Sequence, residues 1–364
     1  MLAWKSVRQS VAYRVLLLLL FLYLFLFSID LMGASLKMFG KGFAESLINS
    51  TSNPFIGVFI GILVTSIIQS SSSTTSIVVG MVGSGVMNIP NAIPIVMGAN
   101  IGTSVTNILV SLAHINRSSE FRRSFSTSLV HDFFNQLSVI TIFPLQYYFN
   151  YLGKTASFIG IKFYDIGGLS FFSPIKAMTH PAVKLCLAYI GDYPIVILLI
   201  ALFCLFFALK KMVDTLRVLV VKRTEAWFDK VLFRNALTAF AVGLFLTMLA
   251  QSSSITTSLV VPMAGAGLLT IEQIFPYTLG ANIGTTITAI LASLVTANPN
   301  AVIVAFAHTI FNISGIFIWW PLKVVPITIA KKMGDFALIS KLIPVGYIIL
   351  FFFILPVAMI LFFK

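Results

Sequence analysis

The sequence is poor in charged residues and almost free of cysteine. Only 10% of its 364 residues are charged and 58% are hydrophobic, whereas about a quarter of an ordinary soluble domain is charged. The two cysteines, Cys186 and Cys204, lie in apolar surroundings and suggest neither a disulfide framework nor a cysteine-based metal site. This composition excludes an ordinary soluble protein and indicates a chain that has lipid as its solvent.

Several apolar runs reach the roughly 20 residues that a membrane-spanning helix needs. The plainest are Val11–Gly33, Pro194–Met212 and Leu342–Phe363. The first of these is too long, and too poor in a small-residue cleavage site, to be a removable signal, so we take it as the first span. We expect no folded soluble domain, because even the longest polar stretch, Lys210 to Arg234, is a short connection.

Acidic residues are scarcer than basic ones. The chain has 11 Asp and Glu against 24 Lys and Arg, a net charge of +13. The basic residues gather in clusters, separated by connections with few or none, and this alternation is what the positive-inside rule produces. We therefore expect the clusters to face the cytoplasm and anionic lipid headgroups, and we expect no nucleic-acid partner. The clusters are Lys5, Arg8 and Arg14; Arg117, Arg122 and Arg123; Lys210, Lys211, Arg217, Lys222, Arg223, Lys230 and Arg234; and Lys331, Lys332 and Lys341.

Two sequence blocks occur twice, in the same order and register. Gln69–Ser76 reads QSSSSTTS and Gln251–Ser258 reads QSSSITTS. At the same offset, Gly98–Thr103 and Gly280–Thr285 both read GANIGT, and further on HDFFN matches HTIFN at a slightly shorter offset. Paired blocks of this length indicate an internal duplication rather than low complexity.

The basic clusters orient the two copies. If the amino terminus is cytoplasmic and each Gln-Ser-Ser-Ser segment is a re-entrant hairpin, the first hairpin is entered from outside and the second from inside, and every cluster falls on one side. We therefore predict an all-α integral membrane protein with two inverted-topology repeats, each with a re-entrant helical hairpin and broken transmembrane helices. The last helix, Leu342–Phe363, does not fit, because a full crossing would leave Lys364 outside. The predicted parts are a first repeat at 1–149 with its hairpin at about 54–88, an outer linker at 150–193, a second repeat at 194–326 with its hairpin at about 235–270, and a C-terminal amphipathic segment and helix at 327–364.

The serine runs are candidate anion sites. Isolated serines often pack helices together, but these are contiguous, begin with Gln and occur twice. Ser70–Ser73 and Ser252–Ser254 would form unwound tips, with half-helices beginning near Thr74 and Ile255. Helix N-termini offer unpaired N–H groups and a positive dipole end, which suit an oxyanion.

The GANIGT spans are candidate cation sites. Gly98, Gly102, Gly280 and Gly284 allow either unwinding or close backbone approach, with ordinary small-residue packing as the plain alternative. Unwound carbonyls, with Asn and Thr oxygens, are hard ligands of the kind that small cations such as sodium prefer. No Lys or Arg lies in either repeated block, so a bound anion needs a counter-charge that sodium can supply.

These paired motifs, together with EFRR at Glu120–Arg123 and the following VHDFFN, resemble the type II sodium-phosphate cotransporter family over roughly Pro54–Leu145 and Asn235–Leu322. The resemblance implies sodium-coupled phosphate import, with both Gln-Ser-Ser-Ser segments in contact with phosphate and sodium. It implies no cofactor and no enzymatic activity. The short linker, unlike the large glycosylated loop of animal members, makes us expect a multi-pass protein of a bacterial inner membrane.

Asp132 is a predicted functional site, because an unpaired carboxylate inside a membrane is expensive. The resemblance implies that members with this Asp move net charge through an additional sodium ion. A salt bridge to Arg122 or Arg123 is the structural alternative. We expect His131 and His308 to make structural hydrogen bonds rather than relay protons, whereas Asn135 and Asn312 are open to either ligation or helix packing.

Other functions remain as alternatives. One is sodium-coupled transport of arsenate, sulfate or a dicarboxylate, the last favoured if the two serine tips lie far apart. An intramembrane serine hydrolase would need one serine and one oriented base, which the duplicated serines do not offer, and a channel or structural role is disfavoured by the repeats. The oligomeric state is left open. The predicted phosphate-binding residues are Gln69, Ser70, Ser71, Ser72, Gln251, Ser252, Ser253 and Ser254, and the predicted sodium-binding residues are Gln69, Ser73, Thr74, Asn100, Thr103, Asp132, Asn135, Gln251, Thr256, Asn282 and Thr285.

Overall fold

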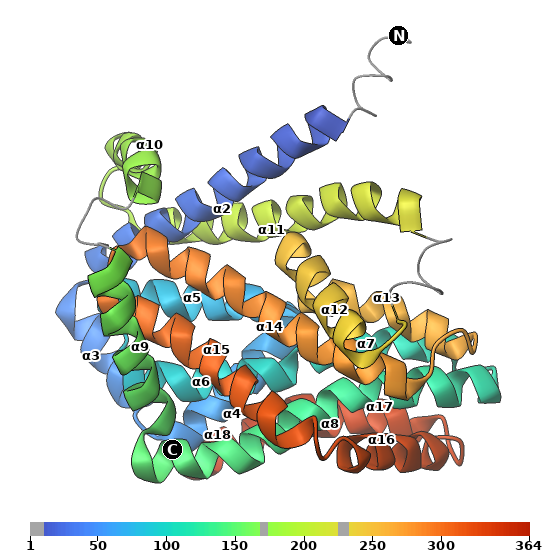
Figure 1. The fold of residues 1–364 in the computed structure, drawn as a ribbon. Coiled ribbons are helices and arrows are strands. Elements are labelled where there is room, and N and C mark those ends of the chain that lie inside the picture. The colour runs from blue at the N-terminus through green and yellow to red at the C-terminus, as the bar shows by residue number, and fades with distance from the viewer. Residues whose placement is uncertain (1–10, 168–173, 225–232) are drawn as a thin grey trace.

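The computed structural model describes residues 11–167, 174–224 and 233–364, and within these ranges it is helical with no β-strand (Figure 1). The basic residues Lys5, Arg8 and Lys230 lie outside the described residues. Six helical stretches of the described chain are long and apolar enough to cross a membrane, which confirms an all-α membrane protein. They are Tyr13–Met38, Ile89–His114, Pro194–Met212, Ile271–Thr296, Pro299–Trp319 and Leu342–Phe363.

The first half begins with the long apolar helix α2 (Val11–Met38) and contains the first hairpin. Helix α4 (Pro54–Ile68) forms a bent pair with the preceding helix α3 (Gly40–Ser50), at an angle of 99°. Helix α3 is not among the segments expected from the sequence. The remaining helices of this half are α5 (Ser71–Ser84), α6 (Ile89–Gly102), α7 (Ser104–Ser111), a short 3-10 turn (Leu112–His114) and α8 (Ser118–Phe149).

The stretch expected to link the repeats is largely helical. It contains α9 (Tyr151–Gly167) and α10 (Pro174–Ile190), and α11 (Pro194–Thr224) follows. Helix α11 packs along α2, and the two run side by side in Figure 1. These are the helices that contain the predicted spans Val11–Gly33 and Pro194–Met212, so two of the most apolar segments of the described chain lie against each other.

The second half repeats the helix order of the first. Helices α12, α13 and α14 correspond to α4, α5 and α6 with α7, and α15 corresponds to α8 by the HTIFN motif. A continuous helical stretch ends the chain, with a π-helical turn at Leu350–Ile354 in its middle. The elements are α12 (Ala236–Ala250), α13 (Ser253–Gly265), α14 (Ile271–Thr296), α15 (Pro299–Trp319), α16 (Val324–Phe336), α17 (Leu342–Ile349) and α18 (Leu355–Phe363).

The glycines of the GANIGT blocks allow two helix pairs to pack very closely. A Cβ atom on Gly98 would overlap the carbonyl oxygen of Val58, and one on Gly280 would overlap the carbonyl oxygen of Phe240. Helix α6 can therefore approach α4, and α14 can approach α12, only because these positions lack a side chain. Close approach, one of the two roles expected of these glycines, is confirmed for the described structure.

The prediction of broken spans at both GANIGT blocks was wrong for the second repeat. Helix α14 runs without interruption through Gly280, Asn282 and Gly284. In the first repeat, the break between α6 and α7 is confined to Thr103, whose φ and ψ of −58° and −31° remain helical. The glycines serve packing, so the backbone carbonyls stay engaged in helical hydrogen bonds rather than turning towards an ion.

Two of the basic clusters lie at the same end of the molecule. Arg122 of α8 is paired with Asp335 of α16, and the Lys341 ammonium donates a 2.7 Å hydrogen bond to the side-chain oxygen of Asn116. The clusters around Arg122 and Lys331 are thus neighbours in space, as the positive-inside pattern requires of residues on one side of a membrane.

Candidate functional site

Each hairpin turns at a glutamine in the left-handed conformation. Gln69 ends α4 with φ of 58°, and Gln251 ends α12 with φ of 53°. The next residue is extended in both cases, with φ of −151° at Ser70 and −154° at Ser252. The repeated sequence therefore adopts one repeated backbone conformation, and a non-glycine residue at positive φ is uncommon enough to point to a functional constraint.

The unwound tips are shorter than the serine runs. Helix α5 begins at Ser71 and α13 at Ser253, so the prediction of starts near Thr74 and Ile255 was wrong. The reason in the first hairpin is an N-cap, in which the Ser70 hydroxyl accepts a 3.2 Å hydrogen bond from the Ser73 amide. The following serines consequently sit in the first helical turn, where backbone N–H groups lack helical partners.

The two tips meet. The Ser254 hydroxyl donates a 3.4 Å hydrogen bond to the carbonyl oxygen of Gln69, across 185 positions of sequence. The serines next to the tips are buried, with 4% of Ser71, 2% of Ser72 and 4% of Ser254 exposed. The N-termini of α5 and α13 are thus brought to one buried place, and both carry the positive end of a helix dipole.

The two glutamines are equivalent in backbone but not in environment. Gln69 is exposed, whereas 5% of Gln251 is exposed and its amide donates a 2.5 Å hydrogen bond to the carbonyl oxygen of Met248. Among the described residues, the side-chain oxygen of Gln251 has no hydrogen-bond partner, and neither has the hydroxyl of Ser72. Buried oxygens without a donor are ready ligands for a cation or a protonated anion.

A second polar group connects the repeats by crossed hydrogen bonds. Nε2 of His131 lies 2.7 Å from the side-chain oxygen of Asn282, and Nε2 of His308 lies 3.4 Å from that of Asn100. The histidine of each repeat therefore pairs with the asparagine of the other. All four side chains are buried, and the hydrogen bonds expected of both histidines are present.

Asn135 extends this crossed group. Its amide donates a 2.9 Å hydrogen bond to the backbone carbonyl of Asn100, and its side-chain oxygen accepts a 2.8 Å hydrogen bond from Asn282. In the other repeat, the Asn312 amide lies 3.3 Å from the Asn100 oxygen. The structure therefore brings three of the predicted sodium ligands together, namely Asn100, Asn135 and Asn282.

Two residues that sequence reasoning missed join this group to the second hairpin. The Asn107 amide lies 3.3 Å from Nδ1 of His131 and donates a 2.8 Å hydrogen bond to the hydroxyl of Thr257. Thr257 follows the second serine tip in α13. Asn107 has no polar counterpart at the duplicated position, which is Ala289, so comparing the repeats would not have revealed it.

The predicted threonine ligands have a local role as well. The hydroxyls of Thr103, Thr256 and Thr285 each donate to the carbonyl oxygen four residues earlier, at 3.0, 3.0 and 3.1 Å. Thr74 does the same at 3.1 Å, and the Ser73 hydroxyl donates to Ser70 at 2.9 Å. Each of these oxygens keeps lone pairs with which it could accept or ligate.

Asp132 is completely buried, and its partner comes from the C-terminal helix. Its Oδ2 accepts hydrogen bonds from the phenol of Tyr347 at 2.5 Å and from the amide of Gln136 at 3.0 Å. Its Oδ1 makes no hydrogen bond to any residue that the structure describes. The helix that the topology could not place thus supplies the nearest donor to the one acidic side chain among the predicted site residues.

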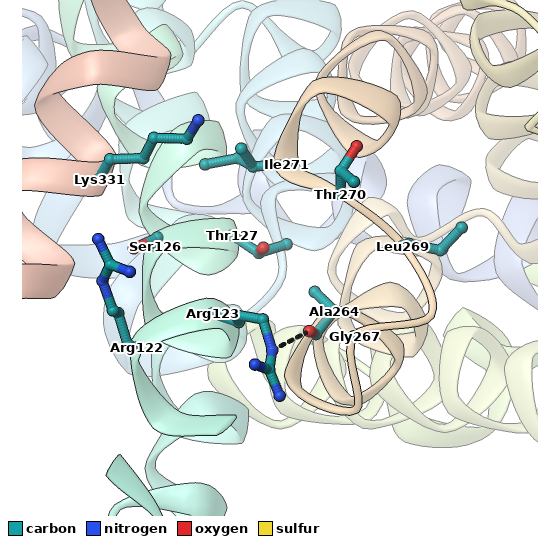
Figure 2. Close-up of a pocket in the computed structure, with 10 residues that line it drawn as sticks. All are labelled: Arg122, Arg123, Ser126, Thr127, Ala264, Gly267, Leu269, Thr270, Ile271 and Lys331. Carbon is teal, nitrogen blue, oxygen red and sulfur yellow. Dashed lines mark hydrogen bonds between the residues drawn. The ribbon is translucent and has the colours of Figure 1, made fainter. Parts of the chain in front are cut away.

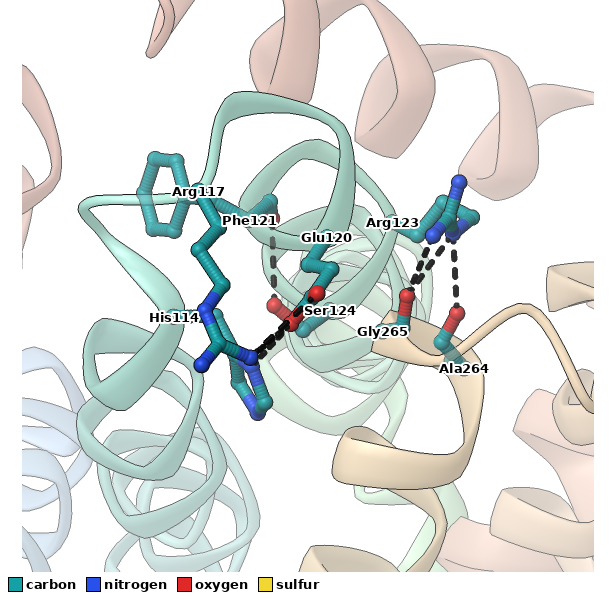
Figure 3. A network of polar contacts seen from close by, with 8 residues as sticks. All are labelled: His114, Arg117, Glu120, Phe121, Arg123, Ser124, Ala264 and Gly265. Carbon is teal, nitrogen blue, oxygen red and sulfur yellow. Dashed lines mark hydrogen bonds and ion pairs between the residues drawn. The ribbon is translucent and has the colours of Figure 1, made fainter.

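The alternative salt bridge from Asp132 to an arginine is wrong. Arg122 pairs with Asp335, and Arg123 donates to the carbonyl oxygens of Ala264 and Gly265, at 2.9 Å for Nε to Gly265 (Figure 3). The same figure shows a separate surface group. There, hydrogen bonds from Arg117 and then His114 hold the pKa of Glu120 below its usual value. Both Arg122 and Arg123 lie near the start of α8, more than two helical turns before Asp132.

Comparison with known proteins identifies relatives that match most of the chain. The family model described as Na+/Pi-cotransporter matches residues 24–170 and 204–359. The sodium-dependent phosphate transport proteins 2B of Homo sapiens and of Pongo abelii are each 32% identical to the chain over 95% of its length. Protein 2A of Ovis aries is 33% identical over 90% of the chain. The chain spans about 64% of the length of each of these relatives. No solved structure matches the chain.

Proposed function

The chain belongs to the Na+/Pi-cotransporter family, and from this premise we propose that it carries inorganic phosphate into the cell together with sodium ions. Its relatives are named sodium-dependent phosphate transport proteins. The residues of the two hairpin tips and of the asparagine group, described above, all lie within the stretches that the family model matches. These residues are the ones to which we assign the transport site.

The observation that carries the proposal is the contact of Ser254 with the Gln69 carbonyl. It brings two helix N-termini to one place, and each offers free N–H groups and a partial positive charge of about half an elementary unit. A tetrahedral oxyanion can accept from both ends at once, with the serine hydroxyls as additional donors. Phosphate would bridge the first turns of α5 and α13.

Sodium supplies the counter-charge that the protein lacks there. No Lys or Arg occurs in either Gln-Ser-Ser-Ser segment, and among the described residues several buried oxygens of predicted ligands have no donor, including Oε1 of Gln251 and Oδ1 of Asp132. Oxygen ligands of this kind suit a hard cation. Coupling follows, because an anion without sodium and sodium without an anion would each leave charge uncompensated in a buried site.

The convergence of the tips also bears on which anion is carried. A dicarboxylate needs two separated oxyanion-binding ends, whereas tips in direct contact suit a single compact anion. Phosphate and arsenate fit this requirement equally well, and sulfate fits it by shape. We propose phosphate because it is the substrate that the relatives' names give.

We further propose that the two repeats are inverted and that transport proceeds by alternating access. The hairpins with α6, α8, α14 and α15 would form the moving part, and the adjacent helices α2 and α11 its support. The crossed pairs of histidine and asparagine support a common moving unit, since they connect α8 with α14 and α15 with α6.

Uptake of radiolabelled phosphate into proteoliposomes tests the function. An inward sodium gradient should drive uptake and an equal potassium gradient should not, with competition by arsenate but not by succinate. The double variant Gln69→Ala with Gln251→Ala should abolish uptake without unfolding the protein, whereas Asn49→Ala, an exposed amide on α3, should not change it. Sodium-independent uptake would refute the sodium coupling. Full uptake by the double variant would refute the proposed site.

A further inference from the structure

A cavity of about 310 Å³ lies near the N-terminal end of α8 (Figure 2). It is enclosed by α8, by the loop that joins α13 to α14, and by α16. Three cationic and three hydroxyl side chains line it, together with apolar residues of the loop. Its volume is at the lower end of the range for small-molecule sites, which is about 300 to 1,000 Å³. The polar lining residues are Arg122, Arg123, Lys331, Ser126, Thr127 and Thr270.

The cavity has an excess of positive charge. Within the described residues, Arg123 has no carboxylate partner and bonds to the carbonyl oxygens of Ala264 and Gly265 only. Arg122 and Lys331 are paired with Asp335 and Glu272, but each member of these pairs is about half exposed. Exposed pairs are weak, so both cations can turn to a stronger anion without a large loss.

Two largely buried hydroxyl residues line the cavity. Only 6% of Ser126 and 3% of Thr127 is exposed, and neither hydroxyl makes a hydrogen bond within the described part of the chain. Figure 2 shows them on α8 between Arg122, Arg123 and Lys331. Buried hydroxyls beside cations are the donors that complete a site for phosphate oxygens.

We propose that this basic pocket binds a phosphate group, supplied either by the headgroup of an anionic lipid or by free phosphate. A lipid source fits the setting, because the pocket lies between helices at the end of the molecule where basic clusters gather, and such pockets bind anionic headgroups. Its wall also includes the apolar side chains of Leu269 and Ile271. The bound group would tie α8 and α16 to the loop after α13. This inference does not depend on the transport site, since no residue of the hairpin tips lines the pocket.

Binding of short-chain lipids to the full chain in detergent tests the proposal. Dioctanoyl phosphatidic acid should bind saturably, dioctanoyl phosphatidylcholine should bind far more weakly, and Lys331→Gln should reduce the affinity for phosphatidic acid about tenfold. Lys332→Gln is the matched control, because it removes the same charge from the neighbouring exposed residue that does not line the pocket. Competition by inorganic phosphate identifies the source: displacement at comparable concentration assigns free phosphate, and no displacement assigns the lipid.

The direction in which a second variant changes the affinity for phosphatidic acid distinguishes a binding site from a merely structural ion pair. Glu272→Gln removes the carboxylate that holds Lys331 at 2.6 Å, so it should tighten phosphatidic acid binding several-fold while Lys331→Gln weakens it. If the ion pair only stabilises the fold, both variants break it and should act alike. Equal effects of the two variants, or equal binding of phosphatidic acid and phosphatidylcholine, would overturn the proposal.

Discussion

The phenol of Tyr347 donates a 2.5 Å hydrogen bond to Oδ2 of Asp132, although the two residues lie 215 positions apart. The carboxylate is completely buried, and the second donor to the same oxygen is Gln136, which also donates to the Tyr347 oxygen at 2.8 Å. One carboxylate oxygen thus accepts hydrogen bonds from two side chains, while the other accepts none within the described part of the chain. The C-terminal helix is thereby joined to the only carboxylate of the proposed sodium site.

Replacing Tyr347 with Phe should weaken both stability and sodium coupling. The change removes one of two donors from a buried carboxylate, which costs about 1 to 3 kcal/mol. We expect a lower unfolding temperature in detergent and a higher sodium concentration for half-maximal phosphate uptake. Tyr148→Phe, an exposed tyrosine of α8, is the control and should change neither. An unchanged sodium dependence in Tyr347→Phe would show that this helix does not position the carboxylate.

Replacing Asp132 with Asn should abolish net charge movement while phosphate uptake continues. The carboxylate is the only formal charge in the proposed site, and an amide preserves its size and one acceptor. A membrane potential of 100 mV changes the free energy of moving one charge by about 2.3 kcal/mol. This corresponds to a roughly fiftyfold change in phosphate accumulation at equilibrium. Uptake by the native protein should therefore respond to an imposed potential and that of the variant should not. A variant that retains the same response would exclude Asp132 from charge coupling.

Replacing Gly98 or Gly280 with Ala should destabilise the protein. The added methyl group would overlap a carbonyl oxygen of the adjacent hairpin helix, and overpacking of this kind costs about 1 to 3 kcal/mol. Gly33→Ala in α2 is the control, since nothing lies within 4 Å of its Cβ position. That change should leave stability equal or raise it by up to about 1 kcal/mol. Thermal unfolding in one detergent compares them, and a neutral Gly98→Ala would contradict the close approach.

Asn107 and Thr257 should be energetically coupled. The Thr257 hydroxyl lies 3.0 Å from the Asn107 side-chain oxygen and 2.8 Å from its amide nitrogen, so each single replacement removes the hydrogen bonding that connects α7 with α13. A double-mutant cycle with Asn107→Ala and Thr257→Val should give a coupling free energy of about 0.5 to 3 kcal/mol. A parallel cycle of Thr257→Val with Tyr148→Phe should be additive. Additivity in both cycles would remove this connection between the repeats.

The class of protein and the repeated motifs of the site can be predicted from the residues alone. Apolar length and charge alternation predict membrane helices, because a span of lipid demands a fixed length of apolar helix. The duplicated motifs identify the hairpins at Gln69 and Gln251, since copies of one local sequence take one local conformation. The match with the family model confirms the resemblance that these motifs suggested.

Which of these motifs touch each other depends on how the whole chain folds. The contact of Ser254 with Gln69, the crossed pairing of His131 with Asn282, and the role of Tyr347 as partner of Asp132 join residues more than 140 positions apart. Such contacts depend on how helices pack, which a local pattern does not record. The early start of α5 likewise required a hydrogen bond that the sequence permits but does not impose, because the Ser70 hydroxyl can cap the helix only once the left-handed Gln69 has turned the chain.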